Sequence, residues 1–105
     1  MKNQQILEHI KSVGQQVLPA GGQMWLYGSQ ARGEARPDSD WDLLVLIDKD
    51  QLRGSDYDTI IYPLTELGWD LGATINPILY TKKEWESYHF TPFYHNVQND
   101  KIEII

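Results

Sequence analysis

The sequence has no cysteine among its 105 residues. It can therefore form neither a disulfide nor a thiolate metal site, and any metal ion that it binds must be held by oxygen or imidazole ligands. Basic residues are also scarce, since nine Lys and Arg against fifteen Asp and Glu give a formal net charge of −6. Nucleic acids and anionic membranes attract proteins through clustered Lys and Arg, so we expect no direct binding to either.

Long apolar runs are absent as well. None approaches the about 20 residues that a membrane-spanning helix needs, and residues 1–5 lead into a polar helix rather than the apolar core of a signal peptide. We therefore expect a cytoplasmic protein. A chain of 105 residues, 41% of them hydrophobic, can build one modest core. We expect a single domain over residues 1–105.

Hydrophobic periodicity predicts alternating helices and strands, that is, an α/β (α+β) domain. Apolar residues between positions 6 and 17 recur at spacings of three and four, which predicts an amphipathic helix over residues 3–18. Residues 40–48 are apolar on both faces through their middle, as in an interior strand. Pro77 places the strand at 73–80 at an edge or a bulge. The other predicted elements are helices at 56–71 and 82–88, a helix beginning at Thr91-Pro92, and strands at 24–27 and 102–105.

Two carboxylates stand at the start of the predicted interior strand. Residues two apart in a strand point to the same face, so Asp40 and Asp42 project side by side. Two such charges about 5 Å apart repel by about 3 kcal/mol at an effective dielectric of about 20, and a divalent cation removes this cost. Carboxylates without His or Cys favour a hard ion, Mg²⁺ or Mn²⁺, with coordination positions left open for phosphate oxygens.

A second polar feature follows the first predicted strand directly. Gly28 lacks a Cβ, so backbone N–H groups there can approach a ligand closely, and the turn that follows would present further N–H groups to a phosphate. Ser29 adds a hydroxyl donor. Arg32 offers a charged fork for phosphate, or it pairs with a neighbour such as Glu34, and the sequence favours neither alternative.

Seven positions between residues 28 and 42 carry a resemblance to a known family: Gly28, Ser29, Arg32, Gly33, Ser39, Asp40 and Asp42. Gly-Ser-Xaa-Xaa-Arg-Gly followed by Ser-Asp-Xaa-Asp-Leu resembles the signature of the polymerase-β-like nucleotidyltransferases, specifically the minimal nucleotidyltransferases. More weakly, the order of elements and the segment Pro92-Phe93-Tyr94 with Asn96-Val97 also resemble this family. The resemblance implies a small mixed β-sheet flanked by helices.

The resemblance also implies an activity and its residues. Gly28, Ser29, Arg32 and Ser39 would bind ATP or another nucleoside triphosphate. Asp40 and Asp42 would be the catalytic residues and would hold Mg²⁺ or Mn²⁺ during transfer of a nucleoside monophosphate, AMP from ATP, to an acceptor hydroxyl. Minimal nucleotidyltransferases of this size resemble the antitoxins of two-gene systems whose toxin is a helical HEPN-type RNase. The implied partner is therefore such a helical protein, or a second copy of the chain.

One position departs from the family pattern. The family has a third carboxylate on the next strand, and no Asp or Glu lies between Asp70 and Glu84; Asn76 or a neighbour stands in its place. Asn is neutral and a poorer metal ligand. This departure supports an alternative function, a catalytically impaired nucleotide-binding or protein-interaction module. A third alternative is modification of a small molecule such as an antibiotic, which would need a dimer to supply the acceptor pocket.

Other candidate residues have ordinary explanations. The acidic run at 48–58 lacks the residue pattern of an EF-hand loop. No third metal ligand accompanies His89 and His95 in the sequence, so we expect them to have packing or surface roles rather than to bind zinc. The four Trp residues are interpreted as core or interface anchors, because no basic groove accompanies them as in a base-stacking surface.

Overall fold

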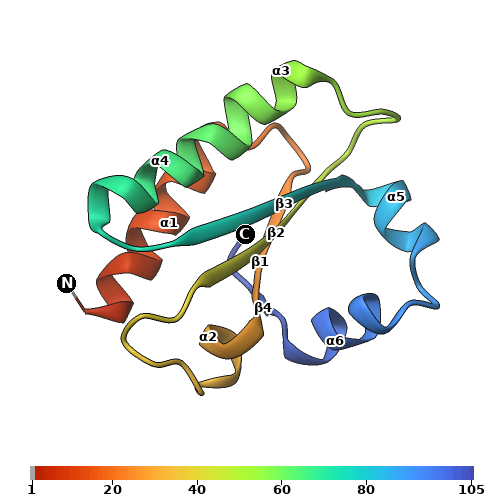
Figure 1. The fold of residues 1–105 in the computed structure, drawn as a ribbon. Coiled ribbons are helices and arrows are strands. Elements are labelled where there is room, and N and C mark those ends of the chain that lie inside the picture. The colour runs from red at the N-terminus through yellow and green to blue at the C-terminus, as the bar shows by residue number, and fades with distance from the viewer. Residues whose placement is uncertain (1) are drawn as a thin grey trace.

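The computed structural model describes residues 2–105 and shows a four-stranded mixed sheet flanked by helices (Figure 1). The strand order is β3-β2-β1-β4; β2 pairs parallel to β3, and β1 pairs antiparallel to both β2 and β4. This is the fold class that the sequence predicts. The strands are β1 (Gln23–Tyr27), β2 (Trp41–Ile47), β3 (Ile75–Thr81) and β4 (Ile102–Glu103).

Helices fill the connections between the strands, largely where the periodicity places them. The apolar face at residues 6–17 becomes α1, and the predicted helix at 56–71 becomes a continuous α3–η1–α4 segment whose middle is π-helical. One helix is missed: α2 lies in the polar segment 29–39, which has no apolar periodicity to reveal it. The helices are α1 (Asn3–Val17), α2 (Gly28–Arg32), α3 (Gly54–Asp56), η1 (Tyr57–Ile61), α4 (Tyr62–Leu71), α5 (Lys82–Ser87) and α6 (Pro92–Asp100).

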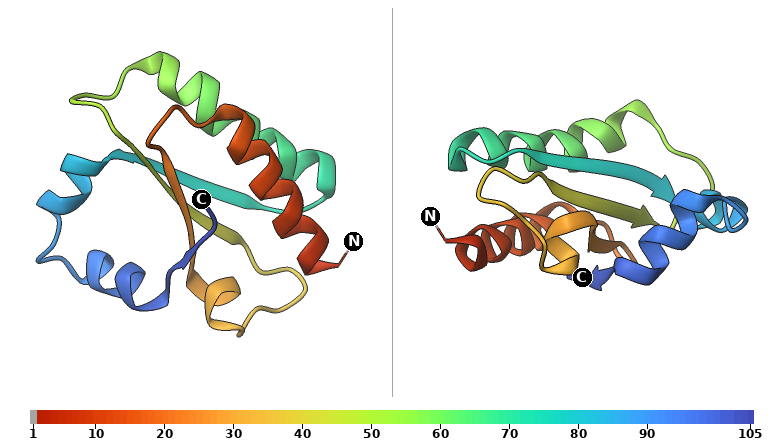
Figure 2. Two further views of the ribbon diagram at one scale, coloured as in Figure 1. Left: turned by 180° about the vertical axis from the view of Figure 1, so that it is seen from behind. Right: turned by 60° about the horizontal axis from the view of Figure 1, so that its bottom comes forward.

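The two faces of the sheet are covered unequally. α1 and the α3–α4 segment lie side by side on one face and enclose the larger core (Figure 2, left). On the other face, Trp25, Leu44 and Leu46 pack with Trp85 of α5 and Val97 of α6. α5 and α6 follow the end of β3, and α6 extends back towards the end of β1, where it lies beside α2 (Figure 1). Within residues 2–105 no helix has the length and apolar character needed to cross a bilayer.

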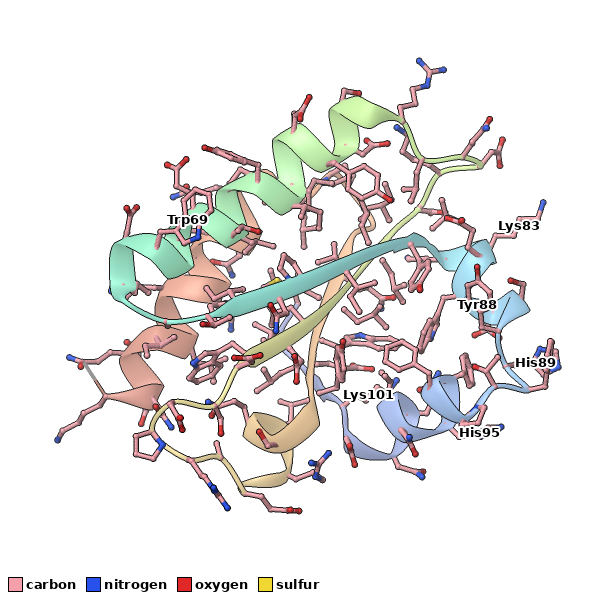
Figure 3. The ribbon with its side chains drawn as sticks, viewed as in Figure 1. Trp69, Lys83, Tyr88, His89, His95 and Lys101 are labelled. Atoms are coloured by element: carbon pink, nitrogen blue, oxygen red, sulfur yellow. The ribbon has the colours of Figure 1, made fainter. Side chains whose placement is uncertain are left out.

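Three of the four tryptophans are core anchors, as the sequence predicts. Trp25, Trp41 and Trp85 are 5% exposed or less. Trp69 differs, because it projects from α4 with 66% of its surface exposed (Figure 3). β3 is an edge strand, which confirms the expectation from Pro77.

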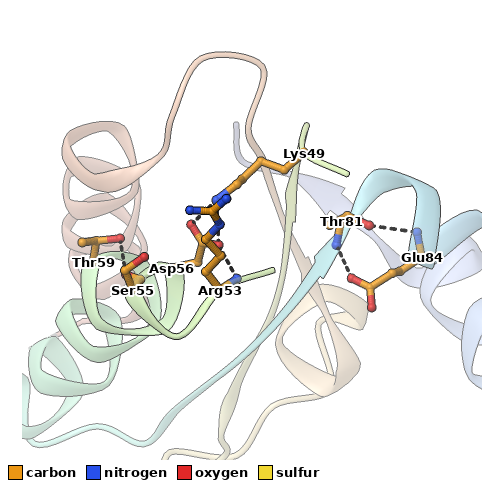
Figure 4. A network of polar contacts seen from close by, with 7 residues as sticks. All are labelled: Lys49, Arg53, Ser55, Asp56, Thr59, Thr81 and Glu84. Atoms are coloured by element: carbon orange, nitrogen blue, oxygen red, sulfur yellow. Dashed lines mark hydrogen bonds and ion pairs between the residues drawn. The ribbon is translucent and has the colours of Figure 1, made fainter. Parts of the chain in front are cut away.

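Threonine side chains cap the first turns of α5 and α6. Thr81 is fully buried and begins α5, where its hydroxyl accepts a hydrogen bond from the Glu84 N–H at 3.0 Å, while the Glu84 carboxylate accepts one from the Thr81 N–H at 2.9 Å (Figure 4). Thr91 caps α6 in the same way through the Tyr94 N–H, ahead of Pro92. The predicted start of α6 is thus confirmed.

Asp56 closes the turn that begins the α3–η1–α4 segment (Figure 4). Its carboxylate accepts hydrogen bonds from the Arg53 N–H at 2.8 Å and from the Lys49 ammonium at 2.9 and 3.0 Å, and the residue is only 9% exposed. The Arg53 hydrogen bond, followed by Lys49, lowers the pKa of Asp56. A carboxylate with a lowered pKa stabilises the fold at every pH above its ordinary value of 3.8, and this contribution is lost as the pH falls through the lower folded value.

We therefore expect Asp56→Asn to lower the urea midpoint at pH 7 and to converge with the wild type as the pH falls through the lowered pKa of Asp56, below which both side chains are neutral. The matched control is Asp58→Asn, because Asp58 is exposed two residues further on and makes no ion pair within residues 2–105. A constant difference between Asp56→Asn and the wild type across this pH range would contradict the assignment.

Candidate functional site

The candidate site is built by the long connection between β1 and β2. The antiparallel register pairs Tyr27 with Asp42, so the chain leaves β1 at Gly28, forms α2, and returns to the same end of the sheet at Asp40. The strand register therefore brings the glycine end and the carboxylate end of the motif together, although 11 residues lie between Gly28 and Asp40.

Gly28 lies directly against Asp42. Its φ is +75°, a conformation that L side chains rarely adopt, and a Cβ built there would collide with Oδ2 of Asp42. Only glycine therefore lets β1 turn into α2 beside this carboxylate. The first N–H groups of α2 have no hydrogen-bond partner within the helix. They lie beside the end of β2 that carries the carboxylates.

The second glycine of the motif has a different role. Gly33 is the C-cap of α2, with φ +72°, and its N–H donates to the Ser29 carbonyl. The Glu34 N–H donates to the same carbonyl at 3.0 Å. No atom lies within 4 Å of a Cβ built on Gly33, so this glycine is needed for the turn alone.

Asp40 and Asp42 lie on one face of the sheet, and Asn76 joins them from β3. The parallel register pairs Asp42 with Asn76. The Asn76 amide Nδ2 donates to Oδ2 of Asp40 at 2.9 Å. Burial is the largest influence on the pKa of Asp42 and raises it. A hydrogen bond from Asn76 lowers this pKa in part, the negative charge of Asp40 raises it further, and the positive charge of Arg32 lowers it. The sequence left open whether Asn76 or a neighbour takes this place, and in the structure Asn76 itself lies beside the carboxylates.

Tyr27 completes this row of side chains and was not predicted as a site residue. It pairs with Asp42 on the opposite side from Asn76, and its ring meets that of Phe93 edge-on with centroids 5.6 Å apart. Partial burial, together with Asp42 and Tyr80, raises the pKa of Tyr27 to about 12, so its hydroxyl stays protonated at neutral pH. The residue directly before Gly28 could have been predicted to lie beside Asp42 only from the strand register.

Arg32 takes the ion-pair alternative in this structure. Its guanidinium lies 3.2 Å from the Glu34 carboxylate and 2.8 Å from that of Asp100 at the end of α6. Asp100 is 68 residues away in the sequence, and nothing in the local pattern indicates it. The side chain of Arg32 is 42% exposed, so the pair is accessible to solvent and to competing anions.

Ser39 forms hydrogen bonds inside the connection between β1 and β2. Its hydroxyl accepts a hydrogen bond from the Arg36 N–H at 2.8 Å, and its carbonyl accepts one from the Gln30 amide at 3.3 Å. These bonds tie the returning chain to α2 just before Asp40. The hydroxyl can also donate, so this contact leaves its proton free for a ligand.

The residues present fit a hard divalent cation, with one carboxylate fewer than the family pattern. Asp40 and Asp42 offer carboxylate oxygens on one face, and a bound cation would offset the burial that raises the pKa of Asp42. Among residues 2–105 no group of three or more His, Cys, Asp or Glu is close enough to hold a metal ion. His89 and His95 lie on the far side of the molecule near α5 and α6, away from the carboxylates (Figure 3).

Comparison with known proteins identifies the family. Residues 6–94 match the pattern of the nucleotidyltransferase domain, so the chain belongs to the nucleotidyltransferase domain family. No curated protein sequence matches the chain significantly. Among solved structures, a chain described as the crystal structure of a toxin–antitoxin with AMP-PNP is similar in fold, with a TM-score of 0.65 and 16% identity over 94% of this chain and 72% of that chain.

The two motif glycines provide a matched test of the site geometry. Both have positive φ, so alanine at either position costs about 1 kcal/mol of backbone strain. We expect Gly28→Ala to cost about 1–3 kcal/mol more than Gly33→Ala, because only at Gly28 must Asp42 be displaced. Urea denaturation of both variants measures the difference, and equal costs would show that Gly28 does not touch Asp42.

Proposed function

We propose that this chain is a Mg²⁺- or Mn²⁺-dependent nucleotidyltransferase that transfers AMP from ATP to a hydroxyl of a partner protein in the cytoplasm. The observation that carries the proposal is the contact between Gly28 and Asp42, which joins the start of α2 to the carboxylate pair. Membership of the nucleotidyltransferase family supports the reaction class. A protein partner is supported by the related fold of the toxin–antitoxin solved with AMP-PNP.

Each residue has a separate task in this proposal. Gly28 and Ser29 direct N–H and hydroxyl donors at the triphosphate, and Ser39 holds the loop that carries Asp40. Asp40 and Asp42 hold the divalent ion, which supplies charge neutralisation at the phosphate oxygens when bound. Arg32 reaches the triphosphate by leaving Asp100 or Glu34.

The acceptor has to come from outside the nucleotide half of the site. The partner that the sequence resemblance implies is a helical HEPN-type toxin, which would make this chain its antitoxin; a homodimer is the alternative source of an acceptor surface. The acidic surface of the chain argues against nucleic acid as the acceptor, because a net charge of −6 repels phosphate backbones.

A second function is favoured by Asn76. An amide cannot take a proton from the attacking hydroxyl, and here its N–H₂ group already donates to Asp40. A chain that binds ATP and a partner protein without transferring AMP would fit this geometry. The two functions share the nucleotide site and differ only in turnover.

Calorimetric titration of ATP with Mg²⁺ tests the shared site. We expect Asp42→Ala to weaken binding by about tenfold or more, because the ion loses one of its two carboxylates. Asn76→Asp should tighten Mg²⁺-dependent binding by about tenfold, since it adds a third carboxylate at the position paired with Asp42. The control is Asp38→Ala, which removes the same charge from the exposed loop beside the site. Unchanged binding in Asp42→Ala would eliminate both functions.

Intact-mass analysis of the chain incubated with its partner, ATP and Mg²⁺ then separates the two functions. Addition of AMP to a protein, abolished by Asp42→Ala, establishes the transferase. Binding of ATP without any added AMP, together with transfer gained in Asn76→Asp, would instead establish the impaired binding module.

The ion pair between Arg32 and Asp100 gives an independent prediction. We expect Asp100→Asn to tighten ATP binding by about two- to tenfold, because the guanidinium loses its closest carboxylate and becomes available to phosphate. Asp50→Asn makes the same charge change at an exposed loop position and is the control. Weaker ATP binding in Asp100→Asn would show that Arg32 serves only to link α2 with α6.

A further inference from the structure

The outer side of the α3–η1–α4 segment carries exposed aromatic and acidic side chains together. Tyr62 is 53% and Trp69 66% exposed, and their rings meet edge-on with centroids 6.0 Å apart. Three exposed carboxylates accompany them, Asp58, Glu66 and Asp70. We call these five residues the α4 surface. Figure 3 shows Trp69 projecting from α4 on this side.

The helical segment that carries the α4 surface supplies no positive charge of its own. The sequence contains neither Lys nor Arg between Gly54 and Thr81. Lys49 forms an ion pair with Asp56, the buried carboxylate of this stretch. No ion pair within residues 2–105 involves Asp58, Glu66 or Asp70. Large exposed aromatic rings among unpaired carboxylates are chemically suited to guanidinium and ammonium groups, which stack on the rings and pair with the carboxylates.

A groove connects the α4 surface to the candidate site. It has a volume of about 220 Å³ and runs from Trp69 to Asn76 past Thr65 and residues 73–75. Asn76 in turn donates its hydrogen bond to Asp40. A side chain that follows this groove from Trp69 therefore arrives beside the carboxylate pair.

The neighbouring strand edge disfavours docking by an added strand. Because the Trp41 N–H donates to the Thr74 carbonyl, the backbone N–H and C=O groups of even-numbered residues here point toward β2, and those of odd-numbered residues point outward. Pro77 has an outward position and no N–H. An added strand would therefore lack a hydrogen bond at the middle of the edge, which favours a partner that binds there through side chains.

We propose that the α4 surface docks a cationic segment of a protein, in which Arg or Lys residues insert between the Trp69 ring and the carboxylates of Glu66 and Asp70. Charge complementarity selects this occupant, since a nucleic acid or an anionic membrane is repelled by the same carboxylates. If the docked protein is also the AMP acceptor, which rests on the proposed function, the groove from Trp69 to Asn76 leads its acceptor side chain to Asp40.

The probe for this proposal is a helical peptide of about 16 residues, long enough for four turns, made of Ala, Leu and Arg without aromatic residues, with a Glu-for-Arg version as its counterpart. Trp69 reports binding directly, because the other three tryptophans are 5% exposed or less. We expect the Arg peptide to bind saturably and to shield Trp69 from acrylamide quenching, and the Glu peptide to do neither. Replacement of Trp69 by Ala should weaken binding in calorimetry by about tenfold.

Two double variants separate this surface from net charge. Glu66→Lys/Asp70→Lys and Glu8→Lys/Asp50→Lys change the net charge of the chain equally, and the second pair lies on α1 and in the loop after β2. We expect the first to abolish peptide binding and the second to weaken it by less than about threefold. Equal losses would overturn the proposal, because the peptide would then recognise only the overall charge.

Two further measurements complete the test. Sedimentation of the chain alone, if it showed self-association that Glu66→Lys/Asp70→Lys removes, would overturn the proposal in favour of a second copy. ATP binding by Glu66→Lys/Asp70→Lys should equal that of the wild type, which shows that the variant folds. A failure of ATP binding in the wild type would contradict the proposed function and leave peptide docking to be judged on its own result.

Discussion

The contact between Gly28 and Asp42 is the constraint on which the site depends. A buried seven-residue strand, β2, enters the sheet with a carboxylate at its second position, and β1 must turn away from the sheet beside it. Any side chain at position 28 would occupy the place of the Asp42 carboxylate. Glycine at position 28 therefore allows the chain to turn there, and it also allows the polar start of α2 to lie against the acidic end of β2.

The cost of gathering carboxylates at this end explains the features around it. Burial and the charge of Asp40 both disfavour the ionised form of Asp42. Asn76 relieves part of this repulsion, because its amide donates to Asp40 where a third carboxylate would add to it. In the absence of a cation, this chain therefore has less electrostatic repulsion at the site than a chain with three carboxylates would have. In the proposed function an aspartate at position 76 would add a metal ligand and a base, so catalysis would favour a carboxylate there, whereas stability in the absence of a cation favours the amide.

Sequence patterns predict those parts of this molecule that are determined locally. The periodicity of residues 6–17 specifies α1, the apolar run after Trp41 specifies an interior strand, and Pro77 marks an edge. α2 was missed because it is a five-residue helix without an apolar periodicity, with a glycine of positive φ at each of its ends. The motif could be recognised because its seven positions all lie within residues 28–42 of the sequence.

The remaining site residues depend on register and long-range pairing. Tyr27 and Asn76 flank Asp42 only because three strands align at that level, and no local pattern specifies this alignment. Asp100 reaches Arg32 from the far end of the chain through the packing of α6 against α2.

The unequal covering of the sheet links the site to its surroundings. One face has α1 and the α3–α4 segment, whereas the other has α5 and α6 packed on Trp25, Leu44 and Leu46, and at the start of β2 Asp40 is exposed and Asp42 is half-buried. In the proposed function a bound nucleotide would cover part of this end of the sheet, and the acceptor would come from another molecule. The exposed aromatic rings of α4 lie where the groove from Asn76 reaches the outside of the fold, so the proposed docking surface leads to the carboxylates. The strand register that places Asn76 beside Asp42 therefore also joins the candidate site to the α4 surface.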